Sequence, residues 1–212
     1  VATPGMVGIV KGKIKNSEIS VEYIPCGVKI PVLEDKQFIE NPFLEEDKSK
    51  FCVLYAGLHG HAQDLSTLLD AAHKLRKNKN IIFYLIGDGP DKQRLIEYAN
   101  NLNLDNVMFL DPVPREKIRK YFQHTDCAIV PLRDLDVFKN VYPSKTFELM
   151  SYGVPSIVGV GGEIEKLINR SNSGLVVRPE NHEDYAQAIL KYATDHNLVS
   201  NIRTNAIKTA KL

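Results

Sequence analysis

The sequence predicts an α/β fold in which a parallel sheet carries helices on both faces. Two observations support this prediction. Short apolar runs rich in β-branched and aromatic residues alternate with longer amphipathic stretches, at the rhythm of parallel strands connected by helices. The apolar runs are nearly continuous rather than alternating, which is typical of strands that are buried on both sides.

Length and composition set the broad class. The 212 residues are enough for one large or two small cores, and 43% hydrophobic with 25% charged residues is typical of a globular protein. The 27 basic and 26 acidic residues nearly cancel, so the charge gives no support to nucleic-acid binding. No apolar run approaches the roughly 20 residues that cross a bilayer. Cys26, Cys52 and Cys127 lack metal-ligand spacing, and we expect buried, reduced thiols in a cytoplasmic protein.

Residues 1–48 differ from the rest of the chain. "TPG" and "MVGIVKGKIK" predict a turn and a short helix, "VEYIPCGV" predicts a strand that ends in a glycine turn, and a charged, proline-broken connector follows. We therefore expect residues 1–48 to be an interdomain linker and the edge of a missing N-terminal domain. Residues 49–196 should form the sheet domain, and residues 197–212 should form a C-terminal helix.

The sheet domain contains alternating candidate strands and helices. The strands are apolar runs at 51–57, 81–87, 106–110, 126–132, 155–160 and 174–178. The helices are amphipathic stretches at 63–77, 90–102, 114–124, 144–152, 162–170, 182–195 and 197–211. Ligands of open parallel sheets bind at the carboxyl ends of the strands. A site is therefore expected among the loops at 57–63, 87–91, 110–114, 132–144 and 160–163.

The stretch "NVYPSKTFELMSYGVPSIV" (140–158) places a lysine in the first turn of a predicted helix. Pro143 favours a helix start and Ser144 is a good cap residue. Lys145, however, faces the positive end of the helix dipole, at a cost of about 0.3–1 kcal/mol. A bound anion would explain the lysine, because free N–H groups and the ammonium would both face it. Glu148, one turn later, could accept hydrogen bonds from a ribose diol. The alternative is an exposed Lys–Glu surface pair.

Glycine-rich loops follow several strands. In "GLHGHAQD" (57–64), Gly57 and Gly60 would let a ligand approach the backbone, although the loop is neither a P-loop nor a GxGxxG motif. His59 and His61 are too few for a metal site, and a plain polar turn into a helix is an equally good interpretation. No Ser–His–Asp arrangement, metal cluster or basic-aromatic surface for nucleic acid can be assembled from the sequence.

Taken in order, these loops resemble the C-terminal, donor-binding domain of retaining GT-B glycosyltransferases of group 1, or family 4, which includes bacterial polysaccharide and lipopolysaccharide enzymes. The similar segments are "IPCGV", "VLYAGLHGHAQDLSTLLDAAHKL", "FYLIGDGPDKQRL", "NVMFLDPVPREKIRKYFQHTDCAIVPL", "YPSKTFELMSYGVPSIV" and "GEIEKLINRSNSGLVVRPEN". The resemblance covers about residues 22–195, and its specificity lies in order and spacing. It implies a Rossmann-like sheet, the C-terminal half of a GT-B fold.

The resemblance also implies roles for single residues. Glu148 matches the second glutamate of the family's E-x7-E motif, which holds the donor's ribose. Ser144 and Lys145 match the junction at the diphosphate, and the segment from Leu110 to Val113 matches the place where the base is bound, largely by backbone. The resemblance adds further donor-binding candidates in the loops: Gly57, His59, Gly60, Gln63 and Asn140.

Two departures from the family pattern concern charge. Asn140 stands where the family has the first glutamate of its motif, so that an amide would contact the sugar or its phosphate. The family's usual arginine and lysine after the first strand fall on Leu58 and Gln63. Lys145 would then supply the positive charge at the diphosphate.

The resemblance finally implies substrates and partners. We expect a nucleotide-diphospho-sugar donor, of the UDP-sugar class, and a glycan or lipid-linked acceptor held by the missing N-terminal domain. No metal and no other cofactor is expected. The full-length enzyme would be cytoplasmic or peripherally associated with the inner face of the plasma membrane. The alternatives are a nucleotide-sugar epimerase of the same fold, which should show further acid–base residues, and a non-catalytic α/β module.

Overall fold

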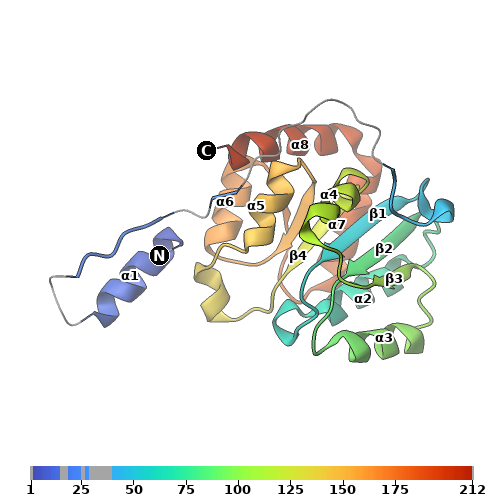
Figure 1. Ribbon diagram of the computed structural model, residues 1–212, viewed down its shortest axis with the longest axis horizontal. Helices are drawn as coiled ribbons and strands as arrows, with labels where there is room; N and C mark the ends of the chain where they lie inside the picture. Colours follow the sequence, from blue (N-terminus) through green and yellow to red (C-terminus); the bar gives the residue numbers. More distant parts are fainter. Residues whose placement is uncertain (1, 15–18, 25–26, 29–39, 212) are drawn as a thin grey trace.

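The computed structural model describes residues 2–14, 19–24, 27–28 and 40–211 (Figure 1). Its strands are β1 (Phe51–Ala56), β2 (Ile81–Ile86), β3 (Val107–Leu110), β4 (Cys127–Pro131), β5 (Ser156–Gly159) and β6 (Leu175–Val176). Its α-helices are α1 (Pro4–Lys13), α2 (Leu65–Leu75), α3 (Lys92–Asn101), α4 (Arg115–Gln123), α5 (Ser144–Ser151), α6 (Glu163–Ser171), α7 (His182–Thr194) and α8 (His196–Ala210). Three short 3-10 helices lie at Glu45–Asp47, His61–Gln63 and Asp136–Asn140.

The strands form one six-stranded sheet in the order β3-β2-β1-β4-β5-β6, and every neighbouring pair is parallel. The chain first builds the sheet outward from β1 to β3 and then returns to the other side of β1 with β4. The order therefore reverses between β1 and β4, where open α/β sheets bind their ligands. The predicted parallel sheet with helices is confirmed.

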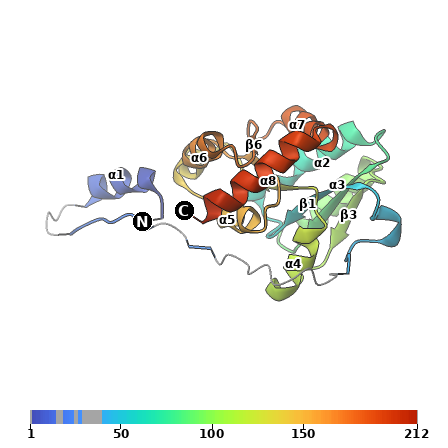
Figure 2. The same cartoon turned by 90° about the horizontal axis from the view of Figure 1, so that it is seen from above.

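Helices cover both faces of the sheet (Figure 2). On one face, apolar side chains of α2, α3 and α7 pack on alternate strand residues such as Val53, Phe83 and Ile129. On the other face, α4, α5 and α6 pack on the intervening residues, such as Leu54 and Ile82. The α8 helix contributes to both layers. Every residue of β2 is buried, as the continuous apolar pattern predicts for a strand covered on two sides.

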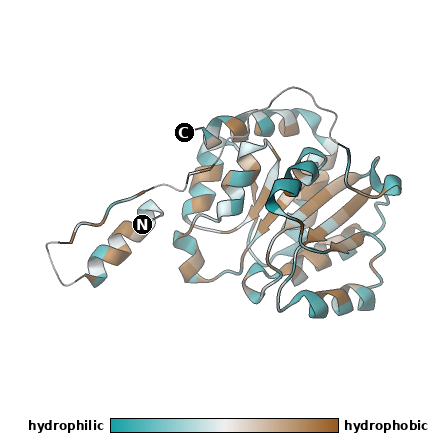
Figure 3. Cartoon of the chain, in the orientation of Figure 1, coloured by the Kyte–Doolittle hydropathy of each residue, from teal (hydrophilic) through white to brown (hydrophobic). Residues whose placement is uncertain are grey.

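The distribution of hydropathy explains why the molecule folds in this way. The strands are uniformly apolar, whereas the outward faces of α3 and α4 are polar (Figure 3). The α2 helix shows the same division, because its buried residues recur at helical spacing: Leu65, Leu68, Leu69, Ala72 and Leu75. The two free cysteines in the part of the chain that the structure describes, Cys52 and Cys127, are both buried in strands.

The N-terminal residues give a mixed result. The predicted short helix is present as α1, which lies to one side of the sheet domain (Figure 1). The predicted strand "VEYIPCGV" is wrong for residues 21–24, 27 and 28, which form no strand, while its residues 25–26 lie outside the described residues. Phe43 is 6% exposed and packs on the ring of Tyr84, whose hydroxyl donates to Asp47. Within the described residues, Phe43 thus already packs on the sheet, five residues before the boundary predicted near residue 48.

The start of α5 also differs in detail from the prediction. Pro143, and not Ser144, is the N-cap residue, and its carbonyl accepts the N–H of Thr146 at 2.9 Å. Ser144 is the first helical residue, is exposed, and makes no side-chain cap. The proline ring fixes φ at −60° with ψ at 117°, so the cap conformation arises without a capping hydroxyl.

Candidate functional site

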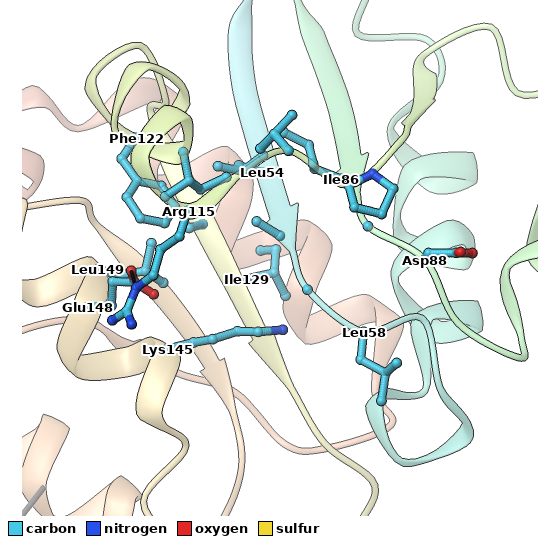
Figure 4. Close-up of a pocket in the computed structure, with 17 residues that line it drawn as sticks. Leu54, Leu58, Ile86, Asp88, Arg115, Phe122, Ile129, Lys145, Glu148 and Leu149 are labelled. Atoms are coloured by element: carbon cyan, nitrogen blue, oxygen red, sulfur yellow. Dashed lines mark ion pairs between the residues drawn. The ribbon is translucent and has the colours of Figure 1, made fainter.

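A pocket of about 490 Å³ opens at the carboxyl ends of β1 and β2 (Figure 4). Its walls come from the loops after β1, β2 and β3 and from the helices α4 and α5. The lining residues are Leu54, Ala56, Gly57, Leu58, Ile86, Gly87, Asp88, Pro112, Val113, Arg115, Ile118, Phe122, Ala128, Ile129, Lys145, Glu148 and Leu149. Most of the lining is apolar, and its charged side chains are Asp88, Arg115, Lys145 and Glu148. Residues of the paired strands β1 and β4, between which the strand order reverses, also line the pocket.

Glycines allow the two loops at the pocket floor to touch. Gly57 has φ +151°, and a Cβ there would lie 1.7 Å from Nζ of Lys145. Gly87 has φ +146°, and a Cβ there would lie 1.9 Å from the carbonyl oxygen of Gly57. At Gly87 a side chain would strike the backbone, and at both positions the positive φ favours glycine. The predicted glycine at position 57 also leaves the space that the Lys145 ammonium occupies.

Lys145 reaches across the pocket from α5 toward the loop after β1 (Figure 4). Its Nζ donates to the hydroxyl of Tyr55 at 3.1 Å and lies 4.4 Å from the centre of the Tyr55 ring. Burial lowers the pKa of the Lys145 ammonium to about 8, although Glu148 acts in the opposite direction. The ammonium is therefore a partly desolvated charge at a helix N-terminus, where the helix dipole disfavours a cation. An anionic ligand bound there would offset both unfavourable effects.

Glu148 lies one turn further along α5 and lines the same pocket. Its side chain is 30% exposed and is 3.9 Å from Nε of Arg115, whose side chain is 90% exposed. Lys145 and Glu148 therefore bond to other residues, and the alternative of an exposed pair between the two is wrong. Arg115, the first residue of α4, was missed by the sequence reasoning, because a basic residue in an amphipathic helix carries no distinguishing signal.

His59 lies beside the pocket but faces the interior. It is 0% exposed, and its ring packs near Tyr55 and Phe109. Neither ring nitrogen has a hydrogen-bond partner among the residues that the structure describes. Its backbone joins the loops after β1 and β2, since its N–H donates to Asp88 at 2.8 Å and its carbonyl accepts from Asp91 at 2.9 Å. The imidazole does not line the pocket in this structure, and its contact with a donor stays a prediction.

Of the predicted residues Gly60, Gln63, Leu110 and Val113, only Val113 lines the pocket. Gly60 is buried beside the side-chain oxygen of Gln63, which has no partner in the described part of the chain. Leu110 ends β3, and its carbonyl accepts the N–H of Gly87 at 3.1 Å. Val113, three residues later, does line the pocket. The structure therefore brings together Gly57, Val113, Lys145 and Glu148.

Asn140 faces α1 rather than the pocket. Its carbonyl accepts from the hydroxyl of Thr3 at 2.5 Å, and Thr3 is 1% exposed. A Cβ on Gly5 would lie 2.7 Å from the Asn140 side-chain oxygen. The hydrogen bond from Thr3 therefore goes to the backbone of Asn140, and Asn140 does not line the pocket. Its contact with a sugar or phosphate stays a prediction.

No group of three or more His, Cys, Asp or Glu side chains is arranged to hold a metal ion in residues 2–14, 19–24, 27–28 and 40–211. Over those ranges, no helix combines the length and apolar character needed to cross a membrane.

The fold and the pocket define a Rossmann-like α/β domain with a cavity at the reversal point of its sheet. The reversal point of a parallel sheet, glycine turns at the strand ends, a cation in a helix's first turn and a carboxylate one turn later all meet in one cavity. The family described as glycosyl transferases group 1 matches residues 36–209. The chain belongs to this family.

Three relatives show the breadth of the similarity. WcaI of Escherichia coli (strain K12), whose name describes a colanic acid biosynthesis glycosyl transferase, is 27% identical over 115 residues, 54% of this chain and 28% of WcaI. A structure of S. aureus TarM with UDP has a TM-score of 0.78 and 16% identity, covering 99% of this chain and 39% of TarM. A structure of the pneumococcal O-GlcNAc transferase GtfA with UDP and GlcNAc has a TM-score of 0.75 and 16% identity, covering 100% of this chain and 41% of GtfA. The chain spans less than half the length of each relative.

Proposed function

We propose that this chain is the donor-binding half of a retaining glycosyltransferase that uses a UDP-sugar and contributes to bacterial surface polysaccharide or lipopolysaccharide. One observation carries the proposal: Lys145 and Glu148, one turn apart on α5, line a single pocket at the reversal point of the sheet. UDP is bound by the similarly folded TarM and GtfA, which supports the choice of nucleotide. The family resemblance supports the retaining outcome and the polysaccharide role.

The pocket divides naturally into three parts for such a donor. The apolar inner wall, with Val113 and Ile118, offers a dry surface for a nucleobase. Glu148 is exposed enough to accept hydrogen bonds from the ribose diol, once Arg115 moves from its position 3.9 Å away. Lys145 and the first turn of α5 would face the diphosphate. Because the ammonium is already placed, it would stabilise the charge that develops on the leaving diphosphate without a metal ion.

The acceptor is proposed to bind a further, preceding domain. A glycosyl transfer needs a second substrate aligned with the sugar, and the residues named above account only for the donor. A glycan or a lipid-linked acceptor fits the proposed role, and a lipid-linked acceptor would bring the full-length enzyme to the inner face of the plasma membrane.

Calorimetric titration with UDP tests the proposal directly. The chain should bind UDP more tightly than uridine, because the diphosphate adds the contact with Lys145. The affinity for UDP should be the same with a chelator as with magnesium or manganese, since an ammonium and a helix end take the place of a cation. Equal affinities for uridine and UDP would contradict the proposed diphosphate site, and a strict metal requirement would contradict its chemistry.

A further inference from the structure

Tyr55 lies beneath the pocket and contacts two of its walls at once. It is 1% exposed and belongs to β1. Its hydroxyl donates to the carbonyl of Leu58 at 2.6 Å and accepts from Nζ of Lys145 at 3.1 Å. The same ammonium lies 4.4 Å from the centre of the Tyr55 ring. A single side chain therefore joins the loop after β1 to the first turn of α5.

The directions of these hydrogen bonds agree with one another. A phenol has one proton, and here it points to the Leu58 carbonyl, so the lone pairs of the oxygen are left for the ammonium. Lys145 has three N–H groups, and the bond to Tyr55 uses one of them. Gly57 leaves the space in which the ammonium sits. The ring and the hydroxyl of Tyr55 thus restrain the Lys145 ammonium in the space beside Gly57, although the lysine side chain is itself flexible.

We propose that Tyr55 is a positioning residue that holds the Lys145 ammonium and the Leu58 loop in the arrangement that a diphosphate needs. The proposal rests on the proposed function, because the diphosphate is the ligand in question. Tyr55 does not line the pocket and acts through Lys145 and through the backbone of Leu58. Without the hydroxyl, the lysine stem and the loop would have to be ordered when the ligand binds, which weakens binding.

Tyr55→Phe tests this role, because it keeps the ring and removes only the hydroxyl. The affinity for UDP should fall about fivefold to twentyfold, less than the loss of roughly tenfold to hundredfold expected when a charged hydrogen-bonding group is removed outright, because the ammonium itself remains. The affinity for uridine should change less than about twofold. Tyr192→Phe is the matched control. Tyr192 is also 1% exposed, and its hydroxyl donates to the backbone carbonyl of Ser156 at 2.9 Å, away from the pocket. This control should leave both affinities unchanged.

A double-mutant cycle separates positioning from a general effect on structure. If Tyr55 acts largely through the lysine, the losses of UDP affinity in Tyr55→Phe and Lys145→Ala should be clearly less than additive in the double variant. Additive losses would show that the hydroxyl does not act through Lys145 and would overturn the proposal.

The pH profile of UDP binding gives a second readout. The hydroxyl accepts from the charged form of Lys145, so its loss should lower the lysine pKa below about 8, and UDP affinity should decline at lower pH than in the wild type. Two buried groups that face Lys145 do not titrate in this range, because burial raises the pKa of Tyr55 and lowers the pKa of His59 to about 4. Glu148 also faces Lys145 and is the same in both proteins that are compared.

The outcomes distinguish this inference from the proposed function. A wild-type chain that does not bind UDP overturns both. A wild-type chain that binds UDP and is weakened by Lys145→Ala, together with a Tyr55→Phe variant that keeps the wild-type affinity and pH profile, overturns the inference alone. If Tyr55→Phe does not fold, the side-chain NMR signal of Lys145 in the wild type decides. An ammonium as rapidly exchanging as that of an exposed lysine such as Lys77 would contradict the proposed positioning.

Discussion

At the scale of single residues, Lys145 makes contacts that a surface lysine would not make. Its ammonium is partly desolvated, is bonded to a buried tyrosine and stands at a helix N-terminus. The desolvation and the helix N-terminus both cost free energy in the empty protein, the contact with Tyr55 offsets part of that cost, and a diphosphate would offset more of it.

Substitutions of Lys145 and Glu148 should separate the two parts of the ligand. Lys145→Ala should weaken UDP binding by about 1.5–3 kcal/mol, the range for a charge-assisted hydrogen bond, and should weaken uridine binding far less. Glu148→Gln should weaken both ligands, since both carry the ribose diol. Calorimetric titration of both variants with both ligands measures this. Lys145→Ala with equal losses for uridine and UDP, or Glu148→Gln with unchanged uridine binding, would contradict the assigned roles.

His59 should make folding stability depend on pH. Its imidazole is buried, and burial, with smaller effects of Lys92 and Lys145, lowers its pKa to about 4. In the unfolded chain the pKa is about 6.5. As the pH falls from about 6.5 toward 4, the unfolded chain takes up a proton that the folded protein does not, so the folded state loses stability.

We expect this effect to cost about 2 kcal/mol of the free energy of unfolding between pH 7 and pH 5. Urea unfolding of the wild type and of His59→Phe at both pH values measures it, because the phenylalanine removes the titrating group and keeps an aromatic ring. His196→Gln, at an exposed position, is the control and should retain the wild-type pH dependence. An unchanged pH dependence in His59→Phe would show that His59 is not the group responsible.

At the scale of elements, the turns after β1 and β2 depend on two glycines in contact. Gly87→Ala would place a methyl group 1.9 Å from the carbonyl of Gly57, at a positive φ. The free energy of unfolding should fall by at least about 2 kcal/mol, because both backbone strain and steric overlap add to the cost. Gly8→Ala, in α1 with open space around it, should not destabilise the chain. Thermal and urea unfolding compare the two variants, and equal stabilities would contradict the close contact.

Strands and helices were predictable wherever burial imposes a pattern. β2 is apolar at every position because helices cover both of its faces, and α2 shows its single buried face in its spacing. The runs near the sheet edge were less informative. Residues 174–178 were predicted to form a strand, but only Leu175–Val176 do so, as β6. β6 is an edge strand that pairs with β5 alone, over these two residues. The N-terminal run "VEYIPCGV" is apolar in part, but in its described residues no strand partner holds it.

The site could be predicted only in part, for a related reason. Lys145 and Glu148 were identified because a cation at a helix N-terminus breaks a local electrostatic rule. Lys145 contacts Tyr55 and Glu148 contacts Arg115. These partners are distant in the sequence, so the contacts become visible only in the folded structure. The direction of His59 could not be predicted either, because a loop has no periodicity from which to infer which side chains point inward.

At the scale of the whole molecule, the N-terminal segment contacts the sheet domain through the 3-10 helix that precedes α5. Thr3 donates to the backbone carbonyl of Asn140 in that helix, and Gly5 lies against the side chains of Asn140 and Glu163. None of these residues lines the pocket.

The final prediction concerns activity. The chain spans 28% of WcaI and 39% of TarM, and transfer requires the acceptor hydroxyl to be aligned with the sugar of the donor. Much of the catalytic advantage comes from this alignment, which a donor domain alone does not provide. The 212-residue chain should therefore bind UDP but transfer no sugar from UDP-glucose or UDP-GlcNAc to a bacterial lipid or glycan extract. Labelled-donor assays should detect transfer only with a longer protein that includes an acceptor-binding domain. Measurable transfer by the 212-residue chain alone would contradict the division of labour proposed here.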